Sequence, residues 1–378
     1  MTDAPLTTPI WIARPGDLSQ MVKTLNHFPI LAVDTEANSL HAFREQVCLI
    51  QYSTPEKDYL VDPFALRDLS PLGPIFASPR IEKVFHAAEY DIIGLKRDYG
   101  FTFANLFDTM VAARILGRPA VGLGSMLEAE FGIVLDKRYQ RANWGQRPLP
   151  AALLAYARLD THYLIALRDR LKEALIAADR WALAQEDFAR LTRTPAGSNG
   201  EDSEEGCWRV AGSHPLTPQQ NAVLMELCAY RSRQAAQADL PLFKVLGNAT
   251  LLQIAETLPA TLNDLREIEG LSPRLLDRHG AALLAAVQRG LQGPPVYRPR
   301  HPHPDDAFLA RLDALREWRK KTARGMQLES DVILPRDMLE ELAQANPRTA
   351  AQLGEVMRDL PWRLEHFGEQ ILHVLQAR

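Results

Sequence analysis

The 378-residue sequence has few cysteines, no long apolar run and no excess of positive charge. Its three cysteines, Cys48, Cys207 and Cys228, are too few and too scattered for a disulfide framework or a zinc cluster, which favours a reducing compartment. No apolar run approaches the roughly 20 residues of a membrane span. The first residues lack a basic region followed by an apolar core, so they do not resemble a secretory signal. A cytoplasmic globular protein of two or three domains is therefore predicted.

The net charge of −4 is concentrated in one short segment. Residues 197–206 contain four acidic residues and no basic one, which accounts for the whole excess. This composition is typical of a flexible, solvated linker. A small basic cluster, Asp136-Lys-Arg-Tyr-Gln-Arg141, could guide phosphates toward a site, or it could be a solvated loop.

Two acidic residues follow an apolar segment near the start of the chain. Residues 30–33 are apolar and partly β-branched, which predicts a buried strand, and Asp34 and Glu36 come directly after it. Side chains two residues apart on a strand point to the same side. The two carboxylates therefore converge closely enough to share a divalent cation, because hard cations prefer oxygen ligands. Taken alone, the same pair is also typical of a solvated turn.

Three further residues extend this acidic pattern. Pro150 and the apolar run after it predict a helix, on which Tyr156 and Asp160 lie four residues apart and so on one face. A phenol and a carboxylate can then reach a common site, although a half-buried tyrosine beside an exposed acid fits the spacing too. Asp91 opens a predicted helix that ends at Gly100, where an acid also favours the helix dipole.

The combination is far more specific than its parts. The order Asp-x-Glu, His-x4-Asp and Tyr-x3-Asp resembles the three motifs of the tyrosine-bearing subclass of Asp-Glu-Asp-Asp 3′–5′ exonucleases. Further segments are similar to those of the ribonuclease D family, namely Phe107-Asp-Thr109, Gly122-Leu-Gly-Ser-Met-Leu127 and Trp144-Gly-Gln-Arg-Pro-Leu149. Asp160-Thr-His-Tyr-Leu164 is also similar to the exosome-associated eukaryotic relative of that enzyme. One departure is Asn143, where the family usually has an acid.

The resemblance implies a metal-dependent 3′–5′ exoribonuclease that acts by two-metal hydrolysis. Its substrate would be RNA, such as precursor tRNA or other structured RNA with a single-stranded 3′ end. Four carboxylates would bind two divalent ions, Mg²⁺ or Mn²⁺, and a tyrosine would orient the attacking water. These residues are Asp34, Glu36, Asp91 and Asp160 as metal ligands, with Tyr156 as the fifth catalytic residue. The expected substrate-binding residues are His86, Lys137, Arg138, Tyr139, Trp144 and Arg147.

Two other functions remain open at this point. One is a 3′–5′ DNA exonuclease of the same chemistry, because the choice between RNA and DNA depends on contacts to the 2′-hydroxyl. The other is a non-catalytic nucleic-acid-binding scaffold, against which the intact set of five active-site residues argues.

The C-terminal half contains an internal repeat. Residues 220–290 match the segment 88 positions later without a gap, and apolar residues recur at intervals of three and four, which predicts two small helical bundles. Matched pairs include Leu224 with Leu312, Tyr230 with Trp318, Arg231 with Arg319 and Pro259 with Pro347. Both copies resemble the helicase-and-RNase-D C-terminal (HRDC) domain, a module that binds nucleic acid or protein. Their aromatic–arginine pairs are expected to be packing residues.

The predicted fold class is an α/β ribonuclease-H-like exonuclease domain followed by two all-α HRDC helical bundles. Strands are expected near 30–34, 47–52, 59–62 and 83–86, with an antiparallel meander among the first of them, and helices near 90–99, 109–116, 126–131 and 150–178. Ser125 and Glu128 supply a capping box for the third of these helices.

Composition also suggests where the domains begin and end. The predicted parts are an exonuclease domain over 1–196, an acidic flexible linker over 197–212, a first HRDC domain over 213–293, a proline-rich connector over 294–304 and a second HRDC domain over 305–378. A monomer that does not bind membranes is expected.

Overall fold

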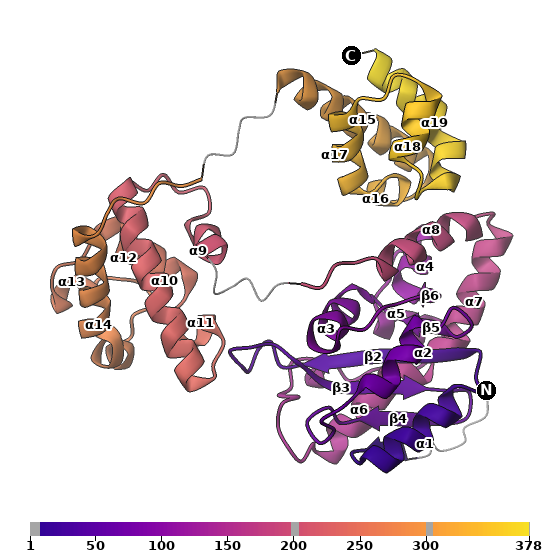
Figure 1. Cartoon of the computed structure of the whole chain (residues 1–378), viewed down its shortest axis with the longest axis horizontal. Helices are drawn as coiled ribbons and strands as arrows, with labels where there is room; N and C mark the ends of the chain where they lie inside the picture. The colour runs from indigo at the N-terminus through magenta and orange to yellow at the C-terminus, as the bar shows by residue number, and fades with distance from the viewer. Residues whose placement is uncertain (1–7, 198–203, 300–304, 378) are drawn as a thin grey trace. The chain divides into compact units, whose positions relative to one another are not determined.

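The computed structural model describes residues 8–197, 204–299 and 305–377 (Figure 1). By contacts it divides into two compact units. One contains Met1–Glu36, Val47–Gly197 and His303–Arg378, and the other contains Ala37–Gln46 and Ser198–Pro302. Among the described residues, no helix has both the length and the apolar character needed to cross a membrane.

A six-stranded mixed sheet forms the centre of the nuclease part. Its strands lie in the order β1-β4-β3-β2-β5-β6. They are β1 (Ile10–Ile12), β2 (Ile30–Ala37), β3 (Val47–Ser53), β4 (Asp58–Val61), β5 (Glu82–Phe85) and β6 (Leu106–Asp108). β4 pairs antiparallel with β3 and parallel with β1, whereas β2, β5 and β6 run parallel. The four predicted strands and the α/β fold class are confirmed.

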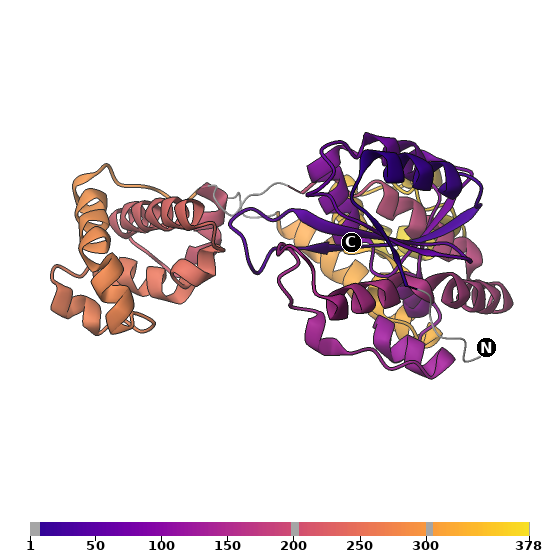
Figure 2. The same ribbon diagram turned by 90° about the horizontal axis from the view of Figure 1, so that it is seen from below.

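Helices cover both faces of this sheet (Figure 2). They are α1 (Pro15–Leu25), α2 (Gly73–Ala77), α3 (Glu89–Tyr99), α4 (Thr109–Ile115), α5 (Leu123–Phe131), α6 (Ala151–His162), α7 (Leu164–Ala177) and α8 (Trp181–Thr192), with short 3-10 turns η1 (Ser70–Leu72) and η2 (Lys137–Tyr139). Figure 2 shows the indigo helix α1 and the magenta helix α6 on opposite faces.

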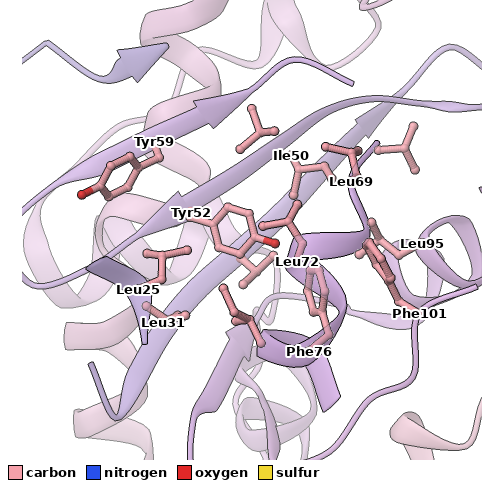
Figure 3. Close-up of a cluster of buried hydrophobic side chains, with 14 of the residues drawn as sticks. Leu25, Leu31, Ile50, Tyr52, Tyr59, Leu69, Leu72, Phe76, Leu95 and Phe101 are labelled. Atoms are coloured by element: carbon pink, nitrogen blue, oxygen red, sulfur yellow. The ribbon is translucent and has the colours of Figure 1, made fainter. Parts of the chain in front are cut away.

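The sheet can carry two hydrophobic cores because its strands are apolar on both faces. On β2, Leu31 and Val33 join a core that contains residues of α1, α2 and α3, while Ala32 between them joins a core with α4, α5, α7 and α8. Figure 3 shows the first of these cores, in which Leu31, Tyr52 and Phe76 gather. Because alternate residues of β2 are packed into cores on opposite faces of the sheet, the end of the strand, and therefore the backbone of Asp34 and Glu36, is held in a fixed position.

Two details of the predicted helices are corrected. The capping box of Ser125 and Glu128 is wrong, because α5 begins at Leu123 after the extended residue Gly122 and both residues lie inside the helix. The single helix expected over 150–178 is two helices, α6 and α7, which meet at Tyr163.

The repeated C-terminal sequence forms two all-helical bundles, as predicted. The first contains α10 (Pro218–Ala238), α11 (Leu242–Val245), α12 (Asn248–Thr257), α13 (Leu262–Arg266) and α14 (Pro273–Gln292). The second contains α15 (Asp306–Met326), α16 (Ser330–Ile333), α17 (Arg336–Ala345), α18 (Ala350–Val356) and α19 (Pro361–Gln376). The aromatic–arginine pairs are packing residues. Tyr230 lies in the core of the first bundle and Trp318 packs against that of the second, and Arg231 and Arg319 each donate to a backbone carbonyl.

The predicted acidic linker over 197–212 is only partly accessible to comparison. Residues 198–203 lie outside the described part of the chain, and the residues after them form α9 (Glu204–Ala211), which packs into the core of the first bundle through Trp208 and Ala211. The prediction of a flexible linker is therefore wrong for residues 204–211, which form a packed helix. Cys207 on α9 and Cys228 on α10 form a disulfide that their spacing did not predict, whereas Cys48 is a buried core residue as expected.

Candidate active site

Three of the predicted carboxylates gather at the end of β2. Asp34 and Glu36 lie on the same side of this strand, and Asp160 reaches them from α6. One carboxylate oxygen from each of the three lies within 4.8 Å of the other two. Three hard oxygen donors at this separation form a suitable set of ligands for a divalent cation.

Asp91, the fourth carboxylate, is joined to the same strand through Thr35. The Thr35 hydroxyl donates to Oδ1 of Asp91 at 2.5 Å, which fixes the first turn of α3 against β2. On the other side of the strand, the amide of Gln51 on β3 donates to Oδ2 of Asp34 at 3.3 Å. The strand therefore positions Asp34 and Glu36 directly and Asp91 indirectly.

Burial and mutual repulsion shift the acidic groups in one direction. Burial, and then the charges of Asp91, Asp160 and Glu36, raise the pKa of Asp34 well above its usual value, and burial with the neighbouring charges does the same to the pKa of Glu36. Burial raises the pKa of Asp91 to about 7, although hydrogen bonds from Thr35 oppose it. Burial and the charge of Asp91 raise the pKa of Asp160 to about 7. All four carboxyl groups can be ionised at the same time only if bound cations compensate their negative charge.

Tyr156 lies one turn before Asp160 on α6 and faces the same site. Its hydroxyl donates to the Asp160 carboxylate and accepts from the side-chain amide of Gln140. Its buried ring has the rings of Tyr139 and Trp144 at centroid distances of 5.9 and 6.1 Å. Burial, followed by the charge of Asp160, raises the pKa of Tyr156 above its ordinary value. The phenol is therefore protonated at neutral pH, and it can orient a water molecule but not deprotonate one.

These residues line one pocket of about 510 Å³. The catalytic candidates in its wall are Asp34, Glu36, Tyr156 and Asp160. The rest of the wall comes from Thr35, His86, the turn at the start of α5 (Gly122, Leu123, Gly124 and Ser125), Leu135 and Gln140. The pocket thus combines a charged floor with a few apolar side chains.

The predicted substrate-binding residues differ in where they lie. His86 lines the pocket, with its Nδ1 2.9 Å from the hydroxyl of Thr109. Tyr139 is half-buried, and the exposed guanidinium of Arg138 lies 5.7 Å from the centre of its ring while it also pairs with Asp136. Lys137 begins η2, but its side chain lies outside the part of the structure that is described.

Trp144 and Arg147, also expected to touch the substrate, do not lie in the wall of this pocket. Trp144 is only 1% exposed and packs in the core beneath α6, so its ring supports Tyr156 and offers no face to a base. The guanidinium of Arg147 donates to both carboxylate oxygens of Asp62, at 2.7 and 2.9 Å, and to the carbonyl oxygen of Cys48. Both residues therefore anchor the loop that carries Gln140 and Tyr139.

We expect Arg147→Ala to lower the free energy of unfolding by about 1–3 kcal/mol, because it leaves the buried Asp62 carboxylate and a buried carbonyl without their donor. Arg138→Ala is the matched control. It breaks an ion pair whose arginine side chain is 80% exposed, so it should leave the free energy of unfolding almost unchanged. Urea unfolding of both variants measures the difference. An Arg147→Ala protein that is as stable as the parent but binds RNA more weakly would return Arg147 to the substrate-binding residues.

Several residues of the site escaped the sequence analysis. Thr35, Gln51 and Gln140 hold catalytic candidates by side-chain hydrogen bonds, and Ser125 lines the pocket. Ser125 lay in a segment that resembled the family, and Thr35 is the central residue of the Asp-x-Glu motif. Asp108 was in such a segment as well, and it caps the start of α4 and also accepts from the backbone amides of Ala87 and Ala88.

Comparison with known proteins agrees with this geometry. A family of 3′–5′ exonucleases matches residues 9–176, and the HRDC domain family matches residues 220–287 and 308–375. The chain is 31% identical to ribonuclease D of Pseudomonas paraeruginosa over 97% of each chain. It is 33% identical to the exosome complex exonuclease RRP6 of Saccharomyces cerevisiae, over 67% of this chain but only 36% of that protein.

Solved structures give the same result. The crystal structure of Escherichia coli RNase D, described as an exoribonuclease involved in structured RNA processing, superposes with a TM-score of 0.71 at 26% identity and covers 98% of this chain and 99% of that one. The catalytic core of RRP6 from Trypanosoma brucei superposes with a TM-score of 0.64 at 28% identity, covering 76% of this chain and 81% of its own. The exonuclease motifs, the two helical bundles and the match along nearly the whole length place this chain in the ribonuclease D family of 3′–5′ exoribonucleases.

Proposed function

We propose that this exoribonuclease shortens structured RNA with a single-stranded 3′ end, precursor tRNA in particular, and releases 5′-mononucleotides. The observation that carries this proposal is the pocket in which three carboxylates, a tyrosine and a histidine from β2, α6 and the end of β5 come together. The fourth carboxylate, Asp91 on α3, is joined to the same strand by the hydroxyl of Thr35. The similarity of the protein's sequence to ribonuclease D covers 97% of the chain, both helical bundles included. The bundles would bind the folded body of such an RNA while the pocket receives its end.

We assign Asp34, Glu36, Asp91 and Asp160 as ligands of two divalent cations, Mg²⁺ or Mn²⁺. The donor set fits such ions, because it offers only carboxylate oxygens and because burial raises the pKa of all four acids in the absence of a compensating charge. The cations would stabilise the charge that develops on the phosphate and the leaving oxygen and would activate the attacking water.

Tyr156 would orient that water. Its hydroxyl lies between the side chains of Asp160 and Gln140, with which it interacts, at the edge of the pocket. A protonated phenol in this place restrains the water by hydrogen bonding, which lowers the entropic cost of reaching the transition state. Tyr139 and Arg138 lie on the loop beside it and would stack against the bases that precede the scissile bond.

A degradation assay on matched oligonucleotides tests the proposal. RNA and DNA of one sequence, and a precursor tRNA with a 3′ extension, are incubated with Mg²⁺, with Mn²⁺ or with a chelator. We expect RNA to be shortened from its 3′ end at least about tenfold faster than DNA, and the chelator to stop the reaction. Equal rates on DNA would favour a DNA exonuclease, and no degradation of any substrate with either metal would favour a binding scaffold.

We further propose a cytoplasmic monomer, since the side chains of one chain complete the site. The cytoplasm keeps most thiols reduced, so Cys207 and Cys228 are expected as thiols there despite their pairing in the structure, and finding them oxidised in cells would overturn the cytoplasmic assignment. Alkylation of free thiols at the moment of cell lysis, followed by counting of labelled cysteines, shows whether Cys207 and Cys228 are reduced in the cell.

Light scattering on the purified protein measures the mass of the particle in solution, for which a monomer predicts 42.4 kDa.

A further inference from the structure

His86 is held in one tautomer by its neighbour Thr109. The Thr109 hydroxyl donates its single hydrogen to the carbonyl oxygen of Phe85, 3.0 Å away. The same hydroxyl oxygen lies 2.9 Å from Nδ1 of His86, and it can therefore only accept a hydrogen from that nitrogen. Nδ1 thus carries the ring hydrogen, and in the neutral imidazole Nε2 is a hydrogen-bond acceptor.

The other ring nitrogen, Nε2, is available to a molecule bound in the pocket. His86 lines the cavity that contains Asp34, Glu36 and Asp160. Within the described part of the chain, Nε2 has no hydrogen-bond partner, and it is not among the polar atoms sealed from solvent. Burial lowers the pKa of His86, and even an ordinary histidine is mostly neutral at pH 8. The pocket therefore presents an accessible acceptor that has no charge.

The chemistry of an RNA 3′ end limits what this acceptor can bind. Phosphate oxygens are acceptors themselves, so they gain nothing from Nε2. The donors that remain are the ribose hydroxyls and the edges of the bases. An exonuclease that proceeds along a chain meets every base in turn, so a contact made at each step falls on the ribose. The 2′-hydroxyl is the group by which a protein distinguishes RNA from DNA.

We propose that Nε2 of His86 accepts a hydrogen bond from the 2′-hydroxyl of the 3′-terminal nucleotide and thereby selects RNA over DNA. This inference rests on the proposed function and adds to it the side chain that recognises the sugar. DNA lacks the hydroxyl, so it would leave the acceptor unpaired when the end of the strand fills the pocket. The loss of one such hydrogen bond corresponds to about a tenfold difference in kcat/KM.

Two variants separate the roles of the two ring nitrogens. In His86→Asn the amide nitrogen takes approximately the place of Nδ1 and keeps a donor toward Thr109, but no acceptor remains near Nε2. In His86→Gln the amide oxygen takes approximately the place of Nε2 and keeps an acceptor. Three RNA oligonucleotides of one sequence, ending in a ribose, a 2′-deoxyribose or a 2′-fluororibose nucleotide, serve as substrates. Fluorine preserves the sugar pucker of RNA but cannot donate a hydrogen bond.

The measurement is kcat/KM of the full-length enzyme for release of the terminal nucleotide at pH 8. For the parent, we expect kcat/KM on each of the two modified ends to be about tenfold lower than on the ribose end. For His86→Gln, we expect it to be several-fold lower. For His86→Asn, kcat/KM on the ribose end should be about tenfold lower than that of the parent, and it should be the same on all three ends. Because the ratio between substrates does not depend on how much enzyme is folded, a partly unfolded variant still gives a valid answer.

Any one of the following results would overturn the inference. If His86→Asn discriminates among the ends as the parent does, or if Ser125→Ala abolishes the discrimination instead, the 2′-hydroxyl is recognised elsewhere while the exoribonuclease assignment stands. If the parent degrades the deoxyribose end as fast as the ribose end, no group in the pocket reads the hydroxyl. If the parent leaves the ribose-ended RNA intact, the proposed function fails as well. Nitrogen-15 NMR of the histidine side chains checks the tautomer, and a His86 ring protonated at Nε2 would contradict the proposal too.

Discussion

Asp160→Asn is expected to lower the rate of nucleotide release by about 10³-fold or more. The physical reason is the loss of one oxygen ligand and one negative charge from the site proposed to hold two cations, whose stabilisation of the transition state is several kcal/mol. Single-turnover degradation of a short RNA in Mg²⁺ measures the rate. Asp169→Asn is the control, because that aspartate lies on α7, pairs with Arg168 and has a side chain that is 55% exposed. A variant at position 160 that retains full activity would end the metal assignment.

The same substitution should stabilise the folded protein when no metal is present. The folded-state pKa of Asp160 is raised to about 7 by burial and by the charge of Asp91, above the usual value of about 3.9 in an unfolded chain. A raised pKa means that stability is complete below the unfolded pKa and is lost as pH rises through the folded pKa. At pH 8 in a chelator, the parent therefore bears an ionised, buried carboxylate that the asparagine variant lacks. We expect the variant to melt at a higher temperature there, and at the same temperature as the parent near pH 3.

Addition of Mg²⁺ should reverse this order. Ligands that bind only the folded state stabilise it, so the parent should melt at a higher temperature in millimolar Mg²⁺ than in chelator. The asparagine variant should gain less, because it has lost one ligand. A parent whose melting temperature does not respond to any divalent cation between pH 6 and 8 would contradict the proposed ligand set.

The strands and the acidic cluster could be predicted because their signals are local. Residues 30–33 are continuously apolar, and the period of two places Asp34 and Glu36 on one side of the same strand. Tyr156 and Asp160 are one turn apart on α6, so their common face follows from helical geometry alone. By contrast, β1 and β6 contain three residues each and carry too little pattern to be recognised.

What could not be predicted depends on contacts between distant segments. Gln51 reaches Asp34 only because β3 pairs beside β2, and Gln140 reaches Tyr156 only because the loop before α6 folds over the site. Trp144 looks from its sequence like an aromatic platform for bases, but its burial beneath α6 assigns it to packing. Residue type gives the possible chemistry of a side chain, whereas burial decides whether a substrate can touch it.

The helical bundles show the same division. The repeat predicted two small helical bundles, and in the structure every helix of the first bundle has a counterpart 88 residues later, for example α11 (Leu242–Val245) and α16 (Ser330–Ile333). The pairing of Cys207 with Cys228 was outside the reach of this argument, because α9 precedes the repeated segment.

Tyr156→Phe is expected to lower turnover by about 10²–10⁴-fold while RNA affinity hardly changes. The substitution keeps the ring between Tyr139 and Trp144, so the packing of α6 is preserved. It removes only the hydroxyl that donates to Asp160 and accepts from Gln140. The four carboxylates are untouched, and binding of the cations should therefore be retained. An interaction that matters mainly in the transition state changes kcat and leaves ground-state binding unaltered.

Two further variants decide whether Tyr156 acts on the water or only supports the helix. Tyr163→Phe is the matched control, because it loses a hydroxyl from the junction of α6 and α7, where the ring packs against Phe131 and outside the pocket, and should leave turnover within a few-fold of the parent. Gln140→Leu removes the partner that orients the Tyr156 hydroxyl, so it should slow turnover in the parent but have no further effect in the Tyr156→Phe protein. Additive losses in the double variant would show that Gln140 acts elsewhere. A Tyr156→Phe enzyme within a few-fold of the parent would assign Tyr156 to packing, and catalysis would then depend on the carboxylates alone.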